Sequence, residues 1–179
     1  MTVVEKLTEL RALMAERGID VYMIPTSDFH ETEYVGEHFK ARYFMSGFSG
    51  SQGTLVVCKD QAALWTDGRY FIQAAKQLEG SGIELMRMGE EGVPTIVSYI
   101  YDHISEHGGF GFDGRVMNTK LAASICAKLS EKQVRIICHE DLVDKIWKER
   151  PALPKDPAFF LKECYSGKST ADKLADILV

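Results

Sequence analysis

The chain has 179 residues, of which 45% are hydrophobic and 26% are charged, a composition typical of a folded globular domain. Its net charge of -5 provides no basic field for a polyanion, which argues against a nucleic-acid partner. No stretch approaches the ~20 apolar residues of a membrane span, so we expect a cytoplasmic protein with no membrane partner. No C-x-x-C pair occurs, and the cysteines are expected to be reduced, buried thiols: Cys58, Cys126, Cys138 and Cys164.

The first part of the chain predicts one helix followed by strands. Apolar residues at helical spacing, from Val3 to Met14, predict a helix over about residues 2–17 that ends at Gly18. The apolar runs that follow are predicted as strands, the last three forming an antiparallel meander: "IDVYMIP", "ARYFMSGF", "GTLVVCK" and "AALWTD".

Helices and strands alternate in the remainder of the first 150 residues. Helices are predicted over about residues 69–79 with Asp67 as the N-cap, around Pro94 to Ile104, after Asn118 or Thr119, and in "DLVDKIWKER". The strands between them are "IELMRM", "GGFGFDG" and "VRIICH". The pattern predicts an α/β fold, a mixed sheet of six or seven strands with helices on both faces.

The composition changes after residue 150. "RPALPKDPAFF" holds three prolines and predicts a linker, because proline disfavours both a helix interior and a central strand. "STADKLADILV" then begins like a helix capped by Ser169. We therefore expect one domain over 1–150, a proline-rich linker over 151–164, and the truncated start of a second domain over 165–179.

A glycine-rich stretch, "SGFSGSQGTLVV", contains Gly47, Gly50 and Gly53 and suggests either a phosphate-binding loop or a turn. A phosphate-binding loop must lead into a helix, whose free N–H groups hold the anion. The residues after Gly53 are β-branched and lack a helical stripe. We therefore expect the glycines to form a turn into a strand.

Two groups of polar residues are candidates for a site. His103 and His107 could share a metal ion, but no third ligand is suitably spaced, so no metal site is predicted. Asp28, His30 and Glu33 follow the end of a buried strand, a position where functional residues often occur.

The segment "WTDGRYF" places an arginine after a carboxylate and a glycine. Trp65 and Tyr70 are expected in the core and Asp67 as a helix cap. Arg69 has no equally plain structural role, because a cation is mildly disfavoured at a helix N-terminus and a guanidinium favours a carboxylate partner. A ligand or another domain could supply that partner.

Several of these segments, taken in order, resemble the N-terminal creatinase-like domain of Xaa-Pro aminopeptidases, the aminopeptidase P family. The resemblance rests on "PTSDFHETEY", "RYFMSGFSGSQGTLVV", "ALWTDGRYFIQAAKQL", "EDLVDKIWKERP" and "YSGKSTADKLADI". It covers essentially the whole chain. Family members commonly have a small residue where this chain has Gln52.

The resemblance implies a ribonuclease H-like fold and a parent metallopeptidase that removes an N-terminal residue preceding proline. Two divalent ions, usually manganese, would be held in a C-terminal domain that this chain lacks, so no catalytic or metal residue and no cofactor is assigned here. The resemblance implies that this domain shapes access to the active site and contributes to domain contacts and a homodimer. Arg69 is then a substrate-side or interdomain candidate, supported by Trp65, Asp67 and Tyr70; Asp28, His30 and Glu33 are candidates without an assigned role.

Two alternatives remain open from the sequence. The same domain occurs in prolidase and creatinase relatives, which act on dipeptides or creatine. The chain could also be a stand-alone binding or dimerisation module.

Overall fold

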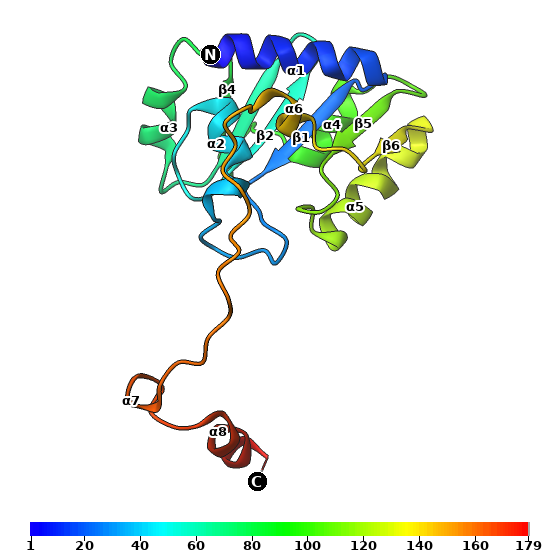
Figure 1. Ribbon diagram of the computed structural model, residues 1–179. Helices are drawn as coiled ribbons and strands as arrows, with labels where there is room; N and C mark the ends of the chain where they lie inside the picture. Colours follow the sequence, from blue (N-terminus) through cyan, green and yellow to red (C-terminus); the bar gives the residue numbers. More distant parts are fainter. Residues whose placement is uncertain (179) are drawn as a thin grey trace.

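A six-stranded mixed sheet forms the centre of the protein in the computed structural model, which describes residues 1–178 (Figure 1). In chain order the strands are β1 (Val21–Pro25), β2 (Thr54–Cys58), β3 (Ala62–Thr66), β4 (Glu84–Arg87), β5 (Gly109–Phe112) and β6 (Arg135–Ile137). Their order across the sheet is β4-β3-β2-β1-β5-β6. The predicted α/β fold with a mixed sheet is confirmed.

Strand β2 runs against the direction of the other five strands. It pairs antiparallel with β1, from Val21↔Cys58 to Pro25↔Thr54, and antiparallel with β3. The pairs β1–β5, β3–β4 and β5–β6 are parallel. Five strands therefore end at the same edge of the sheet.

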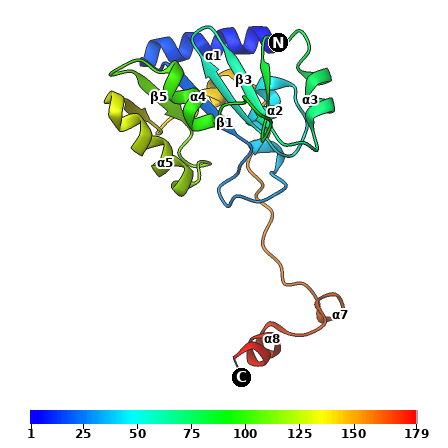
Figure 2. The same cartoon turned by 180° about the vertical axis from the view of Figure 1, so that it is seen from behind.

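Helices cover both faces of this sheet. One face packs against α1 (Val3–Arg17), α2 (Ala41–Ser46), α3 (Phe71–Gln77) and α6 (Leu142–Ile146). The opposite face, seen from behind in Figure 2, packs against α4 (Ile96–His103) and α5 (Thr119–Leu129). Two 3-10 turns, η1 (Glu37–Phe39) and η2 (Ser130–Lys132), complete the layers.

Alternate side chains of each central strand enter the two halves of the core. Tyr22 and Ile24 of β1 pack on the α1 side, whereas Val21 and Met23 pack on the α4 side, and all four are at most 4% exposed. A strand covered on both faces needs an unbroken apolar run, which the sequence provides. Each of these side chains contributes about 1.5–3 kcal/mol by leaving water.

The predicted strand "ARYFMSGF" is wrong, because most of it forms α2. Its buried residues include Met45 and Ser46, and α2 ends at Gly47, which adopts the left-handed conformation with φ +74°. A short apolar run fits a strand and a buried helix equally well, so periodicity cannot separate them. Here tertiary packing against α1 and the sheet selects the helix.

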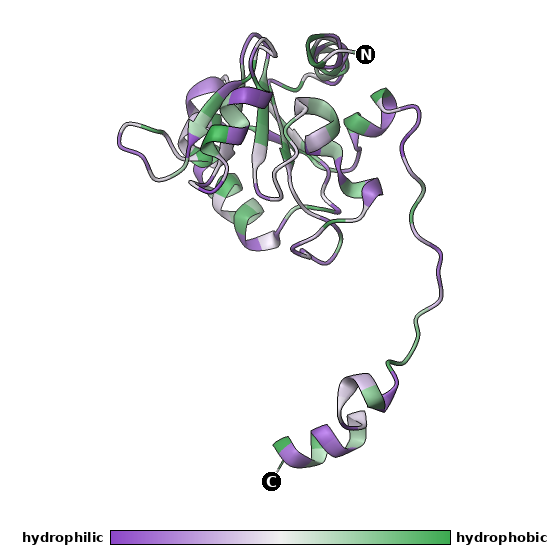
Figure 3. Cartoon of the chain, turned by 90° about the vertical axis from the view of Figure 1, so that its left-hand side faces the viewer, coloured by the Kyte–Doolittle hydropathy of each residue, from purple (hydrophilic) through white to green (hydrophobic). Residues whose placement is uncertain are grey.

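The chain leaves the sheet layers after α6. Residues 152–162 lack regular structure and lead to α7 (Glu163–Ser166) and α8 (Thr170–Ile177), which lie away from the sheet in Figure 1. Ser169 caps α8 by accepting the Asp172 N–H, as predicted. Figure 3 shows several hydrophobic stretches along this region. Its exposed large apolar side chains are those of Phe159, Phe160, Leu161, Tyr165, Leu174, Ile177 and Leu178.

Candidate functional site

The candidate site lies at the edge where β1, β3, β4, β5 and β6 end, which we call the carboxyl edge. The loops 26–36, 67–70 and 113–118 follow β1, β3 and β5 there, and the loop that follows Ser46 of α2 leads into β2 at the same edge. Ligands of open α/β sheets bind in crevices outside the carboxyl ends of the strands. The predicted polar residues therefore lie where such a sheet places a site.

Within the turn from Asp67 to Arg69, the aspartate fixes the arginine side chain by hydrogen bonds. The Asp67 carboxylate accepts hydrogen bonds from the Arg69 backbone N–H at 3.0 Å and from Nε and Nη2 of the guanidinium, both at 2.9 Å. The side-chain hydrogen bond from Arg69 lowers the pKa of Asp67, and the same bond raises the pKa of Arg69. The Arg69 side chain nevertheless remains 66% exposed, so part of the guanidinium faces solvent.

Two expectations about this turn are wrong. Asp67 is not a helix cap, because α3 begins at Phe71 and its N-cap is Tyr70, which makes no side-chain capping bond. Arg69 does not need a carboxylate from a ligand or another domain, because Asp67 of the same turn pairs with its guanidinium. The Asp67 side chain bonds two residues ahead instead of to the helix, which is a common local competitor of capping.

Arg69 lines a recess of about 320 Å³ at the carboxyl edge, which we call the Arg69 recess. Glu33 and Gln52 also line it, together with Thr26 and Ser51. Both Glu33 and Gln52 are exposed. Gln52 therefore lies beside open space, where a larger polar side chain can be accommodated.

A second cavity of about 420 Å³ adjoins the first, and we call it the Tyr43 hollow. Thr26, Glu33 and Ser51 line both cavities, so the two form neighbouring parts of one groove. Tyr34 and Tyr43 are exposed on the Tyr43 hollow, at 78% and 46%. This groove combines exposed aromatic rings, hydroxyl groups and the unburied Glu33 carboxylate.

Asp28 shapes the loop that carries Glu33. Its buried carboxylate accepts N–H bonds from His30 at 2.8 Å and Thr32 at 3.1 Å, and another from the Thr32 hydroxyl. The Thr32 hydroxyl bond is the main cause of a lowered Asp28 pKa. His30 is exposed, and with Asp28 it lines another cavity, which adjoins the Arg69 recess through Glu31 and residues 116–118. Of the three predicted residues, Glu33 alone lines the Arg69 recess.

Trp65 is a core residue, as expected, whereas Tyr70 is only partly buried against the core. Trp65 is 1% exposed, donates its Nε1–H to the Pro94 carbonyl at 2.8 Å, and packs edge-on against Tyr99 with ring centroids 4.9 Å apart. The Tyr70 hydroxyl lies 2.7 Å from the Ser51 hydroxyl. Tyr70 thereby joins the Asp67–Arg69 turn to the glycine-rich loop.

The glycines of loop 46–53 permit close packing, and β2 follows them, as predicted. A Cβ at Gly50 would lie 2.3 Å from the Phe48 ring, and one at Gly53 would lie 2.9 Å from the Trp65 carbonyl oxygen. The loop carries no helix at its end and therefore lacks the free N–H groups of a phosphate-binding loop. It serves as a wall of the groove.

Sequence reasoning missed Arg42, which organises this loop. Arg42 is 4% exposed. Its guanidinium donates to the Thr26 hydroxyl at 2.8 Å and to the carbonyl oxygens of Phe48 and Gly50. Burial lowers the pKa of Arg42 to about 10. The sequence signal was an arginine inside an apolar run, directly before a loop with carbonyl groups that need donors.

A second Asp-Gly-Arg turn follows β5 and was also missed. Asp113 accepts the Arg115 backbone N–H, Nε and Nη2, each at 3.0 Å, which repeats the bonding of the first turn. Arg115 lines the cavity that contains Asp28 and His30, not the Arg69 recess. The repeated tripeptide was visible in the sequence as "TDGRY" and "FDGRV".

Metal ligands are not grouped in the part of the chain that the structure describes. Among residues 1–178, no three His, Cys, Asp or Glu side chains lie together in a way that could hold an ion. Within the same residues, no helix is long and apolar enough to span a membrane. The cysteines are only partly as expected: Cys58 is buried, and burial raises its pKa to about 11, but Cys138 and Cys164 are exposed.

Comparisons with known proteins agree with this fold. The chain is 42% identical to Aminopeptidase P2 of Arabidopsis thaliana, over 97% of this chain and 25% of that protein. It superposes with a TM-score of 0.86 on X-prolyl aminopeptidase from Caenorhabditis elegans, described as a cytosolic enzyme with a di-nuclear active site. The match has 31% identity and covers 99% of this chain and 30% of that one.

An isolated domain of known structure is also similar. The N-terminal domain of cytoplasmic peptidase PepQ from Mycobacterium tuberculosis matches with a TM-score of 0.56 and 27% identity, over 79% of this chain and 98% of that one. This chain spans about a quarter of the length of Aminopeptidase P2. The family model for the creatinase/prolidase N-terminal domain matches residues 6–146. The chain therefore belongs to the creatinase/prolidase N-terminal domain family.

Proposed function

We propose that this chain is the non-catalytic N-terminal part of an Xaa-Pro aminopeptidase, which removes an N-terminal residue preceding proline. The observation that carries the proposal is the match to Aminopeptidase P2, which extends over 178 residues and so beyond the domain itself. The residues of this chain that the structure describes do not fit a metal site. The two metal ions, manganese by the family resemblance, belong to the following catalytic domain.

The role proposed for this domain is to form one wall of the entrance to the active site. The Arg69 recess supports this role, because it lies at the carboxyl edge and presents an exposed guanidinium held in place by Asp67. Trp65 and Tyr70 support the turn. Glu33 is the second candidate for contact with the peptide, since it lines both parts of the groove.

The other partners proposed are the remaining domains of the same protein. Phe159 and Phe160 are 84% and 97% exposed, and the apolar stripe of α8 is open to solvent. Apolar groups exposed in this number need cover from another part of the protein. We propose that 165–179 begins a second domain that provides it, in a cytoplasmic homodimer.

The test is a peptidase assay on the complete enzyme and on this chain alone, each with manganese. The complete enzyme should release the first residue of an Xaa-Pro-Yaa peptide, and this chain should release none. Turnover proportional to the concentration of this chain would show that it is catalytic. Cleavage restricted to Xaa-Pro dipeptides or creatine would assign the chain to a prolidase or creatinase, and a reading frame without a catalytic domain would leave only a binding module.

A further inference from the structure

Residues 147–151, which we call the exit strap, lie across the helices beside the groove before the chain leaves the domain. Trp147 stacks on Phe44 of α2 with ring centroids 4.6 Å apart and an interplanar angle of 7°. The Arg150 guanidinium carbon lies 5.6 Å from the Trp147 ring centroid. The strap is therefore packed against the domain by its aromatic residue.

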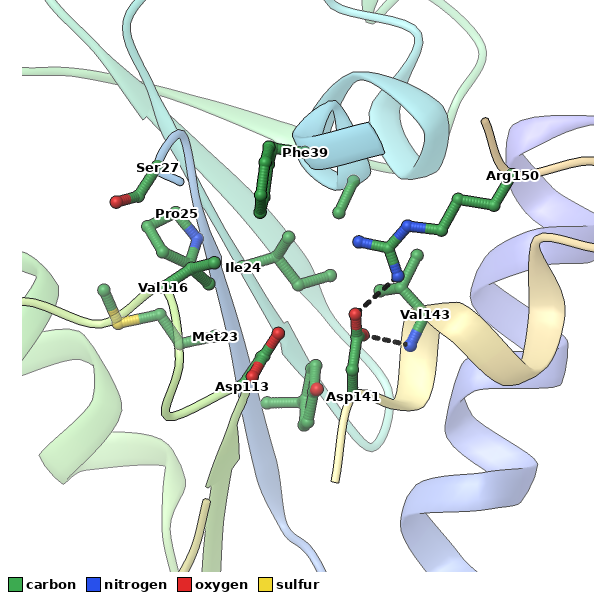
Figure 4. A pocket seen from close by; sticks show the side chains of 12 residues that line it. Met23, Ile24, Pro25, Ser27, Phe39, Asp113, Val116, Asp141, Val143 and Arg150 are labelled. Atoms are coloured by element: carbon green, nitrogen blue, oxygen red, sulfur yellow. Dashed lines mark hydrogen bonds and ion pairs between the residues drawn. The ribbon is translucent and has the colours of Figure 1, made fainter. Parts of the chain in front are cut away.

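Arg150 ties this strap to two elements at once. Its side chain is 7% exposed, and Nη1 lies 2.6 Å from the Asp141 carboxylate, which is 6% exposed. Nη1 also lies 3.1 Å from Asp144, and Nε donates to the His38 carbonyl oxygen at 2.9 Å. Figure 4 shows Arg150 directed toward Asp141, whose other oxygen accepts the Val143 N–H at the start of α6.

The 3-10 turn η1 makes a second bond to the same strap. His38 Nδ1 lies 2.7 Å from the Pro151 carbonyl oxygen, and because a carbonyl can only accept, this ring nitrogen donates. His38 therefore contacts the strap through its own carbonyl and through its ring. The Arg150 guanidinium serves three acceptors in fixed directions, on Asp141, Asp144 and His38, and a lysine could not reach all of them in the same geometry.

The anchored turn is also part of the groove wall. Phe39 and Lys40 follow His38 directly, and both line the Tyr43 hollow. Phe39 also contacts the small cavity beside Arg150 and Asp141 (Figure 4). Through η1, the point where the chain leaves the domain is joined to the wall of the groove.

We propose that Arg150 is a positioning residue that holds the exit strap against η1. The segments after Pro151 thereby start from a fixed position relative to the groove. The linker that follows contains Pro154 and Pro157, and proline-rich chains are semi-rigid. An anchored starting point therefore restricts where the following domain lies. This consequence for the enzyme rests on the proposed function, whereas the anchoring is a property of this chain.

The anchoring is tested by hydrogen exchange on this chain, with Arg150→Gln, His38→Ala and the control Lys40→Gln. Lys40 lies on the same wall and pairs with Glu37, not with the strap. Arg150→Gln should accelerate amide exchange at least ten-fold in both 147–150 and 38–40 while the β1–β2 amides stay protected. His38→Ala should accelerate exchange in 147–150 at least three-fold, and Lys40→Gln should leave that segment unchanged.

Two results would overturn the anchoring. One is unchanged exchange of 147–150 in His38→Ala, which removes no buried charge and is expected to fold. The other is uniformly faster exchange throughout the domain in Arg150→Gln, which would assign Arg150 to general stability.

A separate kinetic experiment on the complete enzyme tests whether the anchored strap restricts the position of the following domain. Arg150→Gln should raise KM several-fold for peptides that extend three or more residues beyond proline, with kcat for an Xaa-Pro-Yaa tripeptide within two-fold. Equal effects on both substrates would contradict the positional role. If the enzyme cleaves no Xaa-Pro peptide, the proposed function fails while the exchange result still stands.

Discussion

Replacing Arg69 by alanine should impair the complete enzyme far more than it destabilises the domain. The Asp67–Arg69 pair is exposed at 31% and 66%, so solvent screens it and its loss costs the domain little stability. A domain of this size loses roughly 2–4 °C in Tm for each kcal/mol. We therefore expect a decrease in Tm of at most about 4 °C.

The expected loss of activity is larger because a ligand would bond to a charged donor that is already oriented. Asp67 occupies Nε and Nη2, and within residues 1–178 Nη1 has no hydrogen-bond partner, so it is available to a peptide oxygen. Hydrogen bonds to charged groups contribute about 1.5–3 kcal/mol. At about 1.4 kcal/mol for each factor of ten, kcat/KM for an Xaa-Pro-Yaa peptide should fall about ten- to one-hundred-fold.

Arg115→Ala is the matched control for this experiment. Arg115 sits in the same kind of Asp-Gly-Arg turn, but its partner Asp113 is only 11% exposed and Nη2 of Arg115 also lies 3.7 Å from Asp141, so its loss should lower Tm at least as much as the loss of Arg69. It lines the cavity that contains Asp28 and His30, which adjoins the Arg69 recess but does not include Arg69, and kcat/KM should stay within about two-fold. Unchanged kinetics in Arg69→Ala, or equal losses in the two variants, would refute a substrate-side role for Arg69.

Three further predictions concern the loops of the groove. Gly50→Ala should destabilise the domain by about 1–3 kcal/mol in urea unfolding, because its Cβ would lie 2.3 Å from the Phe48 ring; wild-type stability would contradict the described packing. Arg42→Met should cost about 2–4 kcal/mol by leaving the Phe48 and Gly50 carbonyls without their donor, and an unchanged urea midpoint would show that these bonds are dispensable. The Thr32 hydroxyl bond lowers the pKa of Asp28 in the folded state. The ionised Asp28 carboxylate therefore stabilises the fold at pH values above its unfolded-state pKa of about 4, and this stabilisation is lost as the pH falls through its folded-state pKa. Asp28→Asn should flatten that acid-side loss in urea unfolding, and parallel pH curves would exclude Asp28 as its source.

The sheet was predictable from sequence because its central strands are buried on both faces. β1 and β2 are short runs of apolar residues bounded by turn signals, a pattern typical of strands that are covered on both sides. Residues 41–46 were not predictable in the same way, because a short run rich in apolar and aromatic residues fits a strand and a buried helix equally. The choice depends on packing against α1 and the sheet, which no local pattern contains.

The candidate site was predictable in position but not in detail. The end of β1 and the "WTDGRYF" segment indicated the carboxyl edge, because polar residues followed buried strands. The pairing within the Asp67–Arg69 turn was missed because α3 begins at Phe71, two residues later than the predicted start at about residue 69. Arg42 was missed because its role depends on carbonyl groups whose orientation is set only in the folded loop.

The strand order has a consequence for how the chain is made. One edge of β1 pairs with β2, whose residues lie about 30 positions later in the chain. The other edge of β1 pairs with β5, which ends at Phe112. During synthesis the β4-β3-β2-β1 half can assemble once residue 87 has emerged from the ribosome, while the free edge of β1 stays open until β5 arrives. An unpaired apolar strand edge is a template for aggregation, so between the synthesis of residue 87 and that of residue 112 the growing chain exposes a central strand edge that the finished sheet covers.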